Sequence, residues 1–306
     1  MPRPPQKPAS TEPPEVVHPI WLLKAIGGVV LVALVCSYLT LCLLYRRGQW
    51  QIVLHPTHKN ASAASSADIV RFGPDESAVP QLVGRWLQAA PGSRYGAITV
   101  LFLPSGDGSL ADSDATLREL QTLGLNVFAF DYRGYGLSTA THPSEQKMIA
   151  DTQSAWNYLT GLRGIPARQI IPYGVGVGAS LAARLAADHP EIPALILVSP
   201  RTDLLEAARR DPRSSLIPAW LLFNQRFPLA DPLSKLSTPK LLFSTTPDPH
   251  PPSFKTAADP KISVVLPSLS GPMYQQAITR LLDAYTTTSS AQPLMPTRAP
   301  SSTNSR

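Results

Sequence analysis

The sequence predicts an α/β fold, with a mostly parallel central sheet covered by helices on both faces, behind one N-terminal transmembrane helix. Three observations predict this class. Short apolar runs alternate with helical patterns over most of the chain. Several of these runs are continuously apolar, as is typical of strands buried on both faces. A stretch without any charged residue, residues 25–45, precedes them.

The uncharged stretch at residues 25–45 is long enough to cross a bilayer, since a helix rises ~1.5 Å per residue and the hydrocarbon core is ~30 Å thick. Trp21 and Tyr45 stand at its ends, where such rings prefer the interface, and Arg46 and Arg47 follow it. A cleaved signal peptide would have a shorter apolar core and a small-residue cleavage site. We therefore expect a single-pass membrane protein anchored in the lipid bilayer through residues 25–45. Basic residues are balanced on the two flanks, so the side of the membrane stays undetermined.

Composition divides the chain into four parts. Residues 1–19 are rich in Pro, and residues 286–306 are rich in Ser, Thr and Pro, so both are expected to be disordered. The anchor takes residues 20–47. Residues 48–285 are then expected to form one α/β domain, whose length suits a single core.

Several classes of site are excluded by composition. Both cysteines, Cys36 and Cys42, lie inside the apolar stretch, so the domain has no disulfide and no thiolate metal site. No cluster of His, Asp or Glu has the spacing of metal ligands, and we expect neither a metal nor a cofactor. The net charge of +6 is scattered, so we expect no nucleic-acid partner.

The elements of the domain follow in order along the chain. Three leading strands, expected to be antiparallel, are predicted at residues 51–54, 68–72 and 82–87. Buried parallel strands are predicted at residues 98–103, 126–130, 169–173, 194–198, 240–243 and 262–266. Helices are predicted at residues 115–123, 144–162, 179–187 and 274–285. The apolar stretch 214–229 fits either a lid over the strand ends or an ordinary core helix. Reactive groups in such a sheet lie beyond the carboxyl ends of the strands.

The most informative strand end is the glycine-rich turn at residues 174–178, Gly-Val-Gly-Val-Gly, which leads into an alanine-rich helix. Gly174 and Gly178 flank a turn so tight that a Cβ beside it would clash. The turn resembles the nucleophile elbow, Gly-x-Ser-x-Gly, of α/β-hydrolases. The position of the nucleophile falls on Gly176, which has no side chain.

The resemblance to α/β-hydrolases covers nearly the whole domain. It is carried also by residues 130–138, Phe-Asp-Tyr-Arg-Gly-Tyr-Gly-Leu-Ser, by Leu-Val-Ser-Pro at residues 197–200, and by residues 227–243. Residues 51–56, just after the anchor, resemble membrane-anchored members of the serine aminopeptidase-like and acyl-hydrolase type. The resemblance implies an α/β-hydrolase fold and a Ser-His-acid triad.

The triad that the resemblance implies is incomplete. Asp248 takes the position of the acid, but the loop at residues 266–272, where the histidine is expected, contains none. The backbone N–H groups of Val177 and Gly106 fall where the oxyanion hole is expected, while Asp107 brings a repelling negative charge beside them. With two of three members missing, only ~10³–10⁴-fold acceleration over water is expected to survive.

Substitute residues are weaker candidates. Ser180 lies one helical turn beyond Gly176 and is expected to pack or to bond a backbone carbonyl. His250 stands alone in a Pro-rich loop and is expected to be solvated. Asp131 and Arg133 are expected to pair within their turn.

A dinucleotide fingerprint, Gly-x-Gly-x-x-Gly/Ala, also fits residues 174–179. It requires an acid near the end of the next strand, and residues 194–200 contain none. Anion binding by the exposed N–H groups of this helix start stays open.

Two hypotheses of function remain. In the first, the protein is a membrane-tethered pseudohydrolase that binds a small acyl-type ligand or a protein partner without turnover. In the second, it is an active esterase, thioesterase or peptidase with a non-standard nucleophile.

Overall fold

A computed structural model describes residues 19–57, 68–73, 79–201, 204–205, 212, 217–245 and 252–290. The chain divides into two units, Met1–Arg47 and Gly48–Arg306. The predicted disordered ends lie largely outside the described residues.

The first unit is built on helix α1 (Pro19–Gly48), whose most apolar window has a mean hydropathy of 2.4. Its length and composition are sufficient for one membrane span. Within this helix the hydroxyl of Thr40 donates to the Cys36 carbonyl at 2.8 Å, so it is satisfied without a partner outside the helix.

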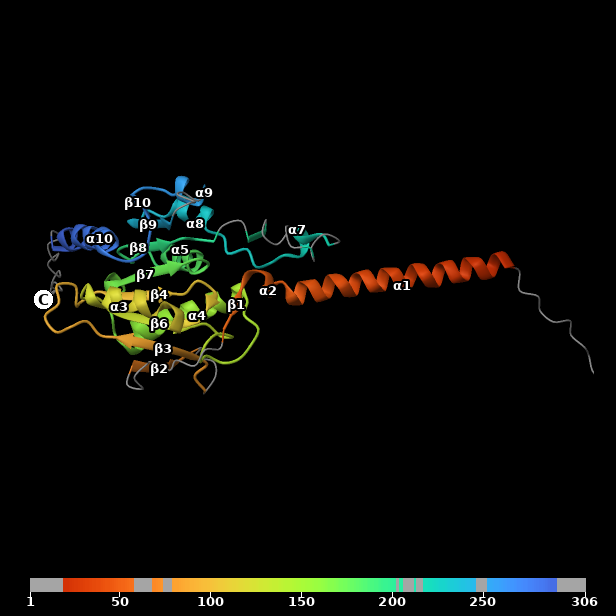
Figure 1. Cartoon of the computed structure of the whole chain (residues 1–306), viewed down its shortest axis with the longest axis horizontal. Coiled ribbons are helices and arrows are strands. Elements are labelled where there is room, and N and C mark those ends of the chain that lie inside the picture. Colours follow the sequence, from red (N-terminus) through yellow and green to blue (C-terminus); the bar gives the residue numbers. More distant parts are fainter. Residues whose placement is uncertain are drawn as a thin grey trace, which may run out of the picture. The chain divides into compact units, whose positions relative to one another are not determined.

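The second unit is organised around an eight-stranded sheet (Figure 1) with the order β2-β3-β6-β4-β7-β8-β9-β10. Strand β3 is antiparallel to both of its neighbours, β2 and β6. Every other pair of neighbouring strands in this sheet is parallel. The strands are β2 (Ile69–Phe72), β3 (Leu82–Leu87), β4 (Thr99–Leu103), β6 (Asn126–Asp131), β7 (Ile170–Val175), β8 (Leu195–Val198), β9 (Lys240–Thr245) and β10 (Lys261–Leu266). A separate short parallel pair joins β1 (His55–Pro56) to β5 (Asp107–Gly108).

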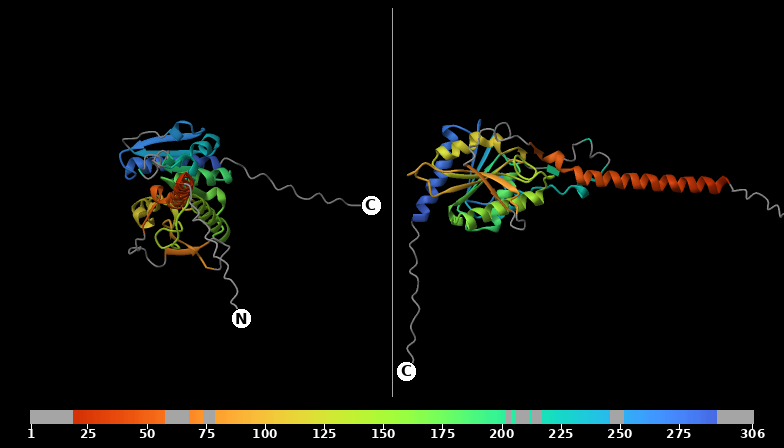
Figure 2. Two further views of the ribbon diagram at one scale, coloured as in Figure 1. Left: turned by 90° about the vertical axis from the view of Figure 1, so that its right-hand side faces the viewer. Right: turned by 90° about the horizontal axis from the view of Figure 1, so that it is seen from below.

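Helices cover both faces of this sheet (Figure 2), which confirms the predicted α/β class. One core lies under α3 (Asp114–Thr122) and α10 (Pro272–Ser290), and the other lies under α4 (Glu145–Asn157), α5 (Gly178–Asp188) and α8 (Ala230–Lys235). The strands between them are buried on both sides, so their apolar runs are continuous rather than alternating. Short helical turns complete the described part: α2 (Trp50–Val53), α7 (Ala219–Leu222), α9 (Pro252–Lys255), η2 (Leu110–Ser113), η3 (Tyr158–Leu162) and η4 (Ala167–Gln169).

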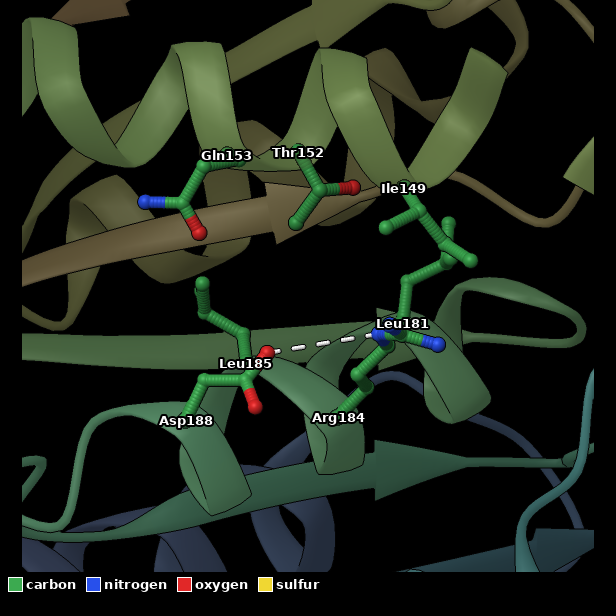
Figure 3. A pocket seen from close by; sticks show the side chains of 7 residues that line it. All are labelled: Ile149, Thr152, Gln153, Leu181, Arg184, Leu185 and Asp188. Carbon is green, nitrogen blue, oxygen red and sulfur yellow. Dashed lines mark ion pairs between the residues drawn. The ribbon is translucent and has the colours of Figure 1, made fainter. Parts of the chain in front are cut away.

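The interface of α4 and α5 is closely filled. The hollow between them (Figure 3) measures about 20 Å³ and is edged by Arg184 and Asp188, whose charged atoms lie 4.0 Å apart. A space of this size admits about one water molecule. It is a packing gap and not a ligand site.

The main error of the sequence prediction concerns residues 51–54, of which the first three are helical and Leu54 is the C-cap of that helix. The Leu54 N–H donates to the Trp50 carbonyl at 2.7 Å and closes one helical turn. The pairing begins later, where His55 lies opposite Asp107. A run of four residues is too short for periodicity to separate a helix from a strand. Elsewhere β7 and β9 each run two residues further than predicted, and α10 continues beyond residue 285.

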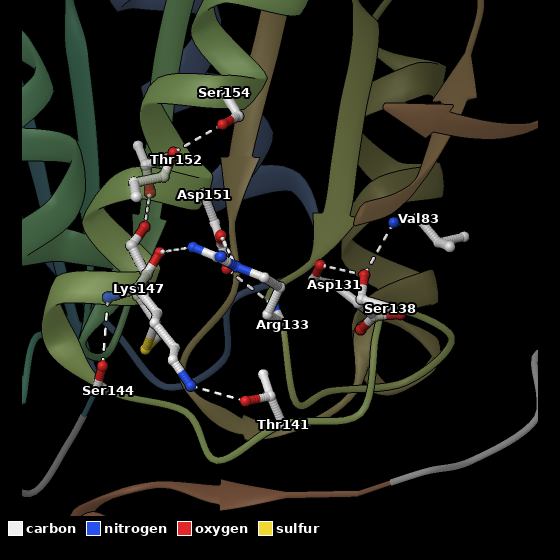
Figure 4. Close-up of polar contacts among 12 residues, drawn as sticks. Val83, Asp131, Arg133, Ser138, Thr141, Ser144, Lys147, Asp151, Thr152 and Ser154 are labelled. Carbon is white, nitrogen blue, oxygen red and sulfur yellow. Dashed lines mark hydrogen bonds and ion pairs between the residues drawn. The ribbon is translucent and has the colours of Figure 1, made fainter. Parts of the chain in front are cut away.

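The predicted pair between Asp131 and Arg133 is wrong. Arg133 instead binds Asp151 of α4, through its Nε at 2.6 Å and its backbone N–H at 2.9 Å (Figure 4). Asp131 accepts from the Leu110 N–H at 2.7 Å, and its carbonyl accepts from the Ser138 hydroxyl at 2.6 Å. Spacing in the chain brought the two residues into one turn, but the turn points their side chains at different elements.

The carboxyl group of Asp151 is fully buried. Burial raises its pKa to about 6, and the hydrogen bonds and charge of Arg133 limit the rise. The Arg133–Asp151 pair therefore fixes the turn after β6 to α4. Its contribution to stability requires both side chains.

Candidate functional site

The turn between β7 and α5 has the geometry of an elbow. Gly176 stands at its tip with φ of +56°, a conformation that side chains disfavour. A Cβ on Gly174 would lie 2.7 Å from the Cα of Ala179, and one on Gly178 would lie 2.7 Å from the Pro104 carbonyl oxygen. The two flanking glycines are therefore required by close backbone approach.

The space above Gly176 is taken by the loop that follows β4. A Cβ placed on Gly176 would lie 3.0 Å from the Cβ of Ser105 and 3.1 Å from its carbonyl oxygen. These distances are tighter than ordinary van der Waals contact. A side chain on Gly176 would therefore press against Ser105.

Four backbone N–H groups of the elbow already have acceptors. The Val177 N–H points at the Ser105 carbonyl at 3.4 Å, and the Gly176 N–H donates to Val198 at 3.0 Å. The Ala179 and Ser180 N–H groups at the start of α5 donate to carbonyls within the turn, at 3.3 and 3.1 Å. An anion at this helix start would have to displace Ser105.

Gly106 lies directly beside Val177, so the two residues expected to form an oxyanion hole meet. A Cβ on Gly106, whose φ is +79°, would lie 2.7 Å from the Val177 Cγ2. The Gly106 carbonyl accepts from the Tyr135 hydroxyl at 2.9 Å and from the His55 N–H at 3.0 Å. These bonds hold the loop closed over the elbow.

A charged cluster of three residues caps the same edge of the sheet. His55 Nδ1 lies 2.7 Å from Asp107 Oδ1, and Arg201 Nη1 lies 3.0 Å from each Asp107 oxygen. Arg201 also donates to the Val53 carbonyl at 2.9 Å. These residues come from the segment after α1, the loop after β4 and the loop after β8, which are far apart in the sequence. The sequence analysis therefore identified Asp107 but neither of its partners.

Ser105 is close to this charged cluster but is not joined to its histidine. The Ser105 hydroxyl lies 3.2 Å from both the backbone N–H and the carbonyl of Asp107. Among the described residues, no hydrogen bond connects Ser105 with His55. A serine, an imidazole and a carboxylate therefore gather at one edge without forming a hydrogen-bonded relay.

The family assignment rests on the middle of the chain. Residues 99–262, which include the elbow and most of the sheet, match the family described as serine aminopeptidase, S33 (Hydrolase_4). The chain belongs to this α/β-hydrolase family. The strand order and the elbow geometry agree with that assignment.

The relatives of this chain differ from it at most positions of the matched regions. Alpha/beta hydrolase domain-containing protein 17C of Xenopus tropicalis is 34% identical over 164 residues, which are 53% of this chain and 49% of that protein. The chain thus spans about half the length of this relative and of its mammalian counterparts. An uncharacterized protein of Mycobacterium tuberculosis is 29% identical over 256 residues, covering 80% of this chain and 88% of that protein.

A solved esterase of Pyrococcus furiosus shares the fold. It is 19% identical, with a TM-score of 0.58, and the match covers 76% of this chain and 98% of the esterase. At this identity the likeness concerns the fold alone.

The remaining candidates from the sequence divide into two groups. Ser180 donates from its buried hydroxyl to the Phe227 carbonyl at 2.7 Å, so it bonds a backbone carbonyl as expected. Asp248, which was predicted to take the acid position, and His250 lie outside the described residues. Among the residues that are described, no group of three or more His, Cys, Asp or Glu side chains could hold a metal ion.

The stretch predicted as a lid or a core helix contains both buried and exposed apolar side chains. Phe223 and Phe227 are buried in the core, whereas Trp220 and Leu221 of α7 are 59% and 64% exposed. A hollow of about 820 Å³ lies at the opposite edge, where β8, β9 and β10 begin, and is lined in part by Ile192, Pro239 and Leu281. It is remote from the elbow, which lies at the carboxyl end of β7.

Proposed function

We propose that this S33 family protein is a pseudohydrolase, which binds an acyl-type ligand or a protein partner at the family site without hydrolysing it. The observation that carries the proposal is the elbow itself: its tip is Gly176, and Ser105 fills the space beside it. In the triad mechanism, an activated hydroxyl attacks the acyl carbon after histidine removes its proton. Gly176 offers no atom for that attack.

The electrostatics of the elbow support the same proposal. An oxyanion hole needs N–H groups that are free to receive the developing negative charge. The Val177 N–H faces the Ser105 carbonyl instead, and the carboxylate of Asp107 lies two residues further on. Developing negative charge would therefore meet an occupied donor, and the nearby guanidinium of Arg201 is already paired with Asp107.

We also propose that α1 anchors the protein in a lipid bilayer through residues 25–45, as a single span. Its apolar length and its basic end at Arg46 and Arg47 support this. Extraction of membranes with alkaline carbonate tests it. The chain should stay with the membrane, and release into the supernatant would contradict the anchor.

Turnover assays test the pseudohydrolase proposal. The full chain in detergent micelles should hydrolyse neither p-nitrophenyl acyl esters nor acyl thioesters above the buffer rate. A turnover number that scales with protein concentration and survives repurification would contradict the proposal.

Gly176→Ser should not create a hydrolase. The new side chain must crowd Ser105, and the loop at residues 266–272 still provides no histidine to activate it. We expect ester turnover indistinguishable from that of the parent chain, with Gly176→Ala as the control for crowding alone. Turnover by Gly176→Ser but not by Gly176→Ala would show that a working base is already present.

One observation favours a second candidate function, an active hydrolase that uses Ser105. This serine lies beside Gly176, and His55 bonded to Asp107 shares its edge. Catalysis would require the Ser105 hydroxyl to give up its contacts with the backbone of Asp107 and to reach the imidazole of His55. If the parent chain has turnover, Ser105→Ala and His55→Gln should each abolish it under this candidate, while Ser180→Ala should retain it.

A further inference from the structure

The segment that follows the membrane helix is fastened to the carboxyl edge of the sheet. From Gln49 onward the chain forms α2 and then β1, which pairs with the loop after β4. Arg201 bonds the Val53 carbonyl at 2.9 Å, and the Thr57 N–H donates to the Gly108 carbonyl at 3.1 Å. The edge that carries the elbow is therefore the edge tied to the anchor.

The α7 segment is bonded to the start of this same connection. The Asn224 N–H donates to Gln49 Oε1 at 2.8 Å, and Gln49 is two residues past Arg47. Two extended residues span at most ~7 Å, and the three from Asn224 back to Leu221 span at most ~10 Å. α7 is therefore connected to Arg47 by a short path that consists of two residues, the Gln49 side chain with its hydrogen bond, and three residues.

The apolar side chains of α7 are held outward on a fixed base. Trp220 and Leu221 are 59% and 64% exposed, while Phe223 directly after the helix is buried. Gln225 Oε1 accepts from the Glu145 N–H at 2.6 Å, and the Arg226 N–H donates to Glu145 Oε2 at 2.7 Å. Figure 1 shows α7 extending from the domain on the side of α2.

We infer that Trp220 and Leu221 form a second membrane contact, which inserts into the headgroup region of the bilayer that holds α1. A tryptophan beside an aliphatic residue suits this region, since its ring is apolar and its N–H stays hydrated. Interfacial segments bury their apolar side ~5–10 Å into the headgroup and acyl boundary. This contact would orient the carboxyl end of the sheet, which carries the elbow, towards acyl chains in the membrane. The inference rests on the proposed anchor but not on the absence of catalysis.

Tryptophan quenching by brominated lipid tests the contact. The full chain is reconstituted in phosphatidylcholine vesicles with and without dibrominated acyl chains. The difference between the parent chain and Trp220→Phe isolates the emission of Trp220, which we expect to lose about half its intensity or more in brominated vesicles.

A matched control moves the tryptophan to another exposed apolar position. Leu162 is 80% exposed and ends the turn that leads to the amino end of β7, at the opposite edge. The added emission of Trp220→Phe/Leu162→Trp should be solvent-like and unquenched. Equal quenching at both positions would indicate non-specific adsorption and overturn the inference.

Two further outcomes would also overturn it. Trp220 emission that is blue-shifted but unquenched would mean that a protein surface covers α7. Unquenched emission at the wavelength of a solvent-exposed tryptophan would mean that neither membrane nor protein covers α7. If carbonate releases the chain, the anchor itself fails; if the chain stays and Trp220 is unquenched, only the second contact fails.

Discussion

Gly178→Ala should lower the free energy of unfolding by about 3 kcal/mol or more, or prevent folding altogether. The added methyl group would overlap the Leu103 carbonyl oxygen and lie 2.7 Å from that of Pro104. Both are main-chain atoms between β4 and the elbow, so no flexible side chain can move aside. For a domain of this size the loss corresponds to a fall in melting temperature of about 6–12 °C. Thermal unfolding of the full chain in detergent, followed by circular dichroism, measures it.

Gly161→Ala is the matched control for this substitution. Gly161 is an exposed residue of the helical turn Tyr158–Leu162, and a Cβ there meets nothing within 4 Å. We expect a change within about 0.5 kcal/mol. Similar melting temperatures for the two variants would show that the strand and the helix at the elbow are not packed as closely as described.

Arg133→Met should cost about 3 kcal/mol at pH 8, because it leaves the carboxylate of Asp151 buried without its partner. Methionine keeps the apolar stem, so the loss reports mainly on charge and hydrogen bonds. Melting temperatures of both chains across pH 5 to pH 8 measure the effect.

The pH dependence of this loss has a definite sign. In the parent chain the folded pKa of Asp151 is about 6, above the ~3.9 of an unfolded aspartate. The folded state therefore binds the extra proton between pH ~4 and ~6, and the contribution of Asp151 to stability falls as the pH rises through that window. Removal of Arg133 raises the pKa further, so the destabilisation should shrink towards pH 5 and grow towards pH 8.

Asp151→Asn in the Arg133→Met background provides the control. The neutral amide removes the buried charge, so the double variant should recover part of the loss at pH 8 and depend little on pH. A loss in Arg133→Met that is constant from pH 5 to pH 8 would contradict the charge argument and point to packing alone.

Much of the fold could be predicted because its signals are local. Strand β3 has its predicted limits. Strands β4 and β8 each begin one residue later than predicted, and their runs were recognisable because strands buried on both faces are apolar almost throughout. The elbow was predictable because a tight turn excludes every residue but glycine at positions 174 and 178. Residues 51–54 were mistaken for a strand because tertiary contacts, and not periodicity, decide so short a run.

The polar surroundings of the elbow could not be predicted in the same way. His55, Asp107 and Arg201 are separated by 52 and 94 residues along the chain, and only the fold brings them together. The same holds for Ser105, whose approach to Gly176 depends on the loop after β4, and for Arg133, whose partner belongs to α4. Local patterns predict the glycine-rich elbow but not the residues that contact it.

Labelling with a fluorophosphonate tests the central claim most directly, since the reagent phosphonylates only serines that are activated as nucleophiles. The full chain is incubated with the probe in micelles and its intact mass is recorded, with Ser105→Ala and His55→Gln treated in parallel. We expect the mass of every chain to stay unchanged. A stoichiometric adduct on the parent chain that either substitution removes would show that the elbow edge is a working active site.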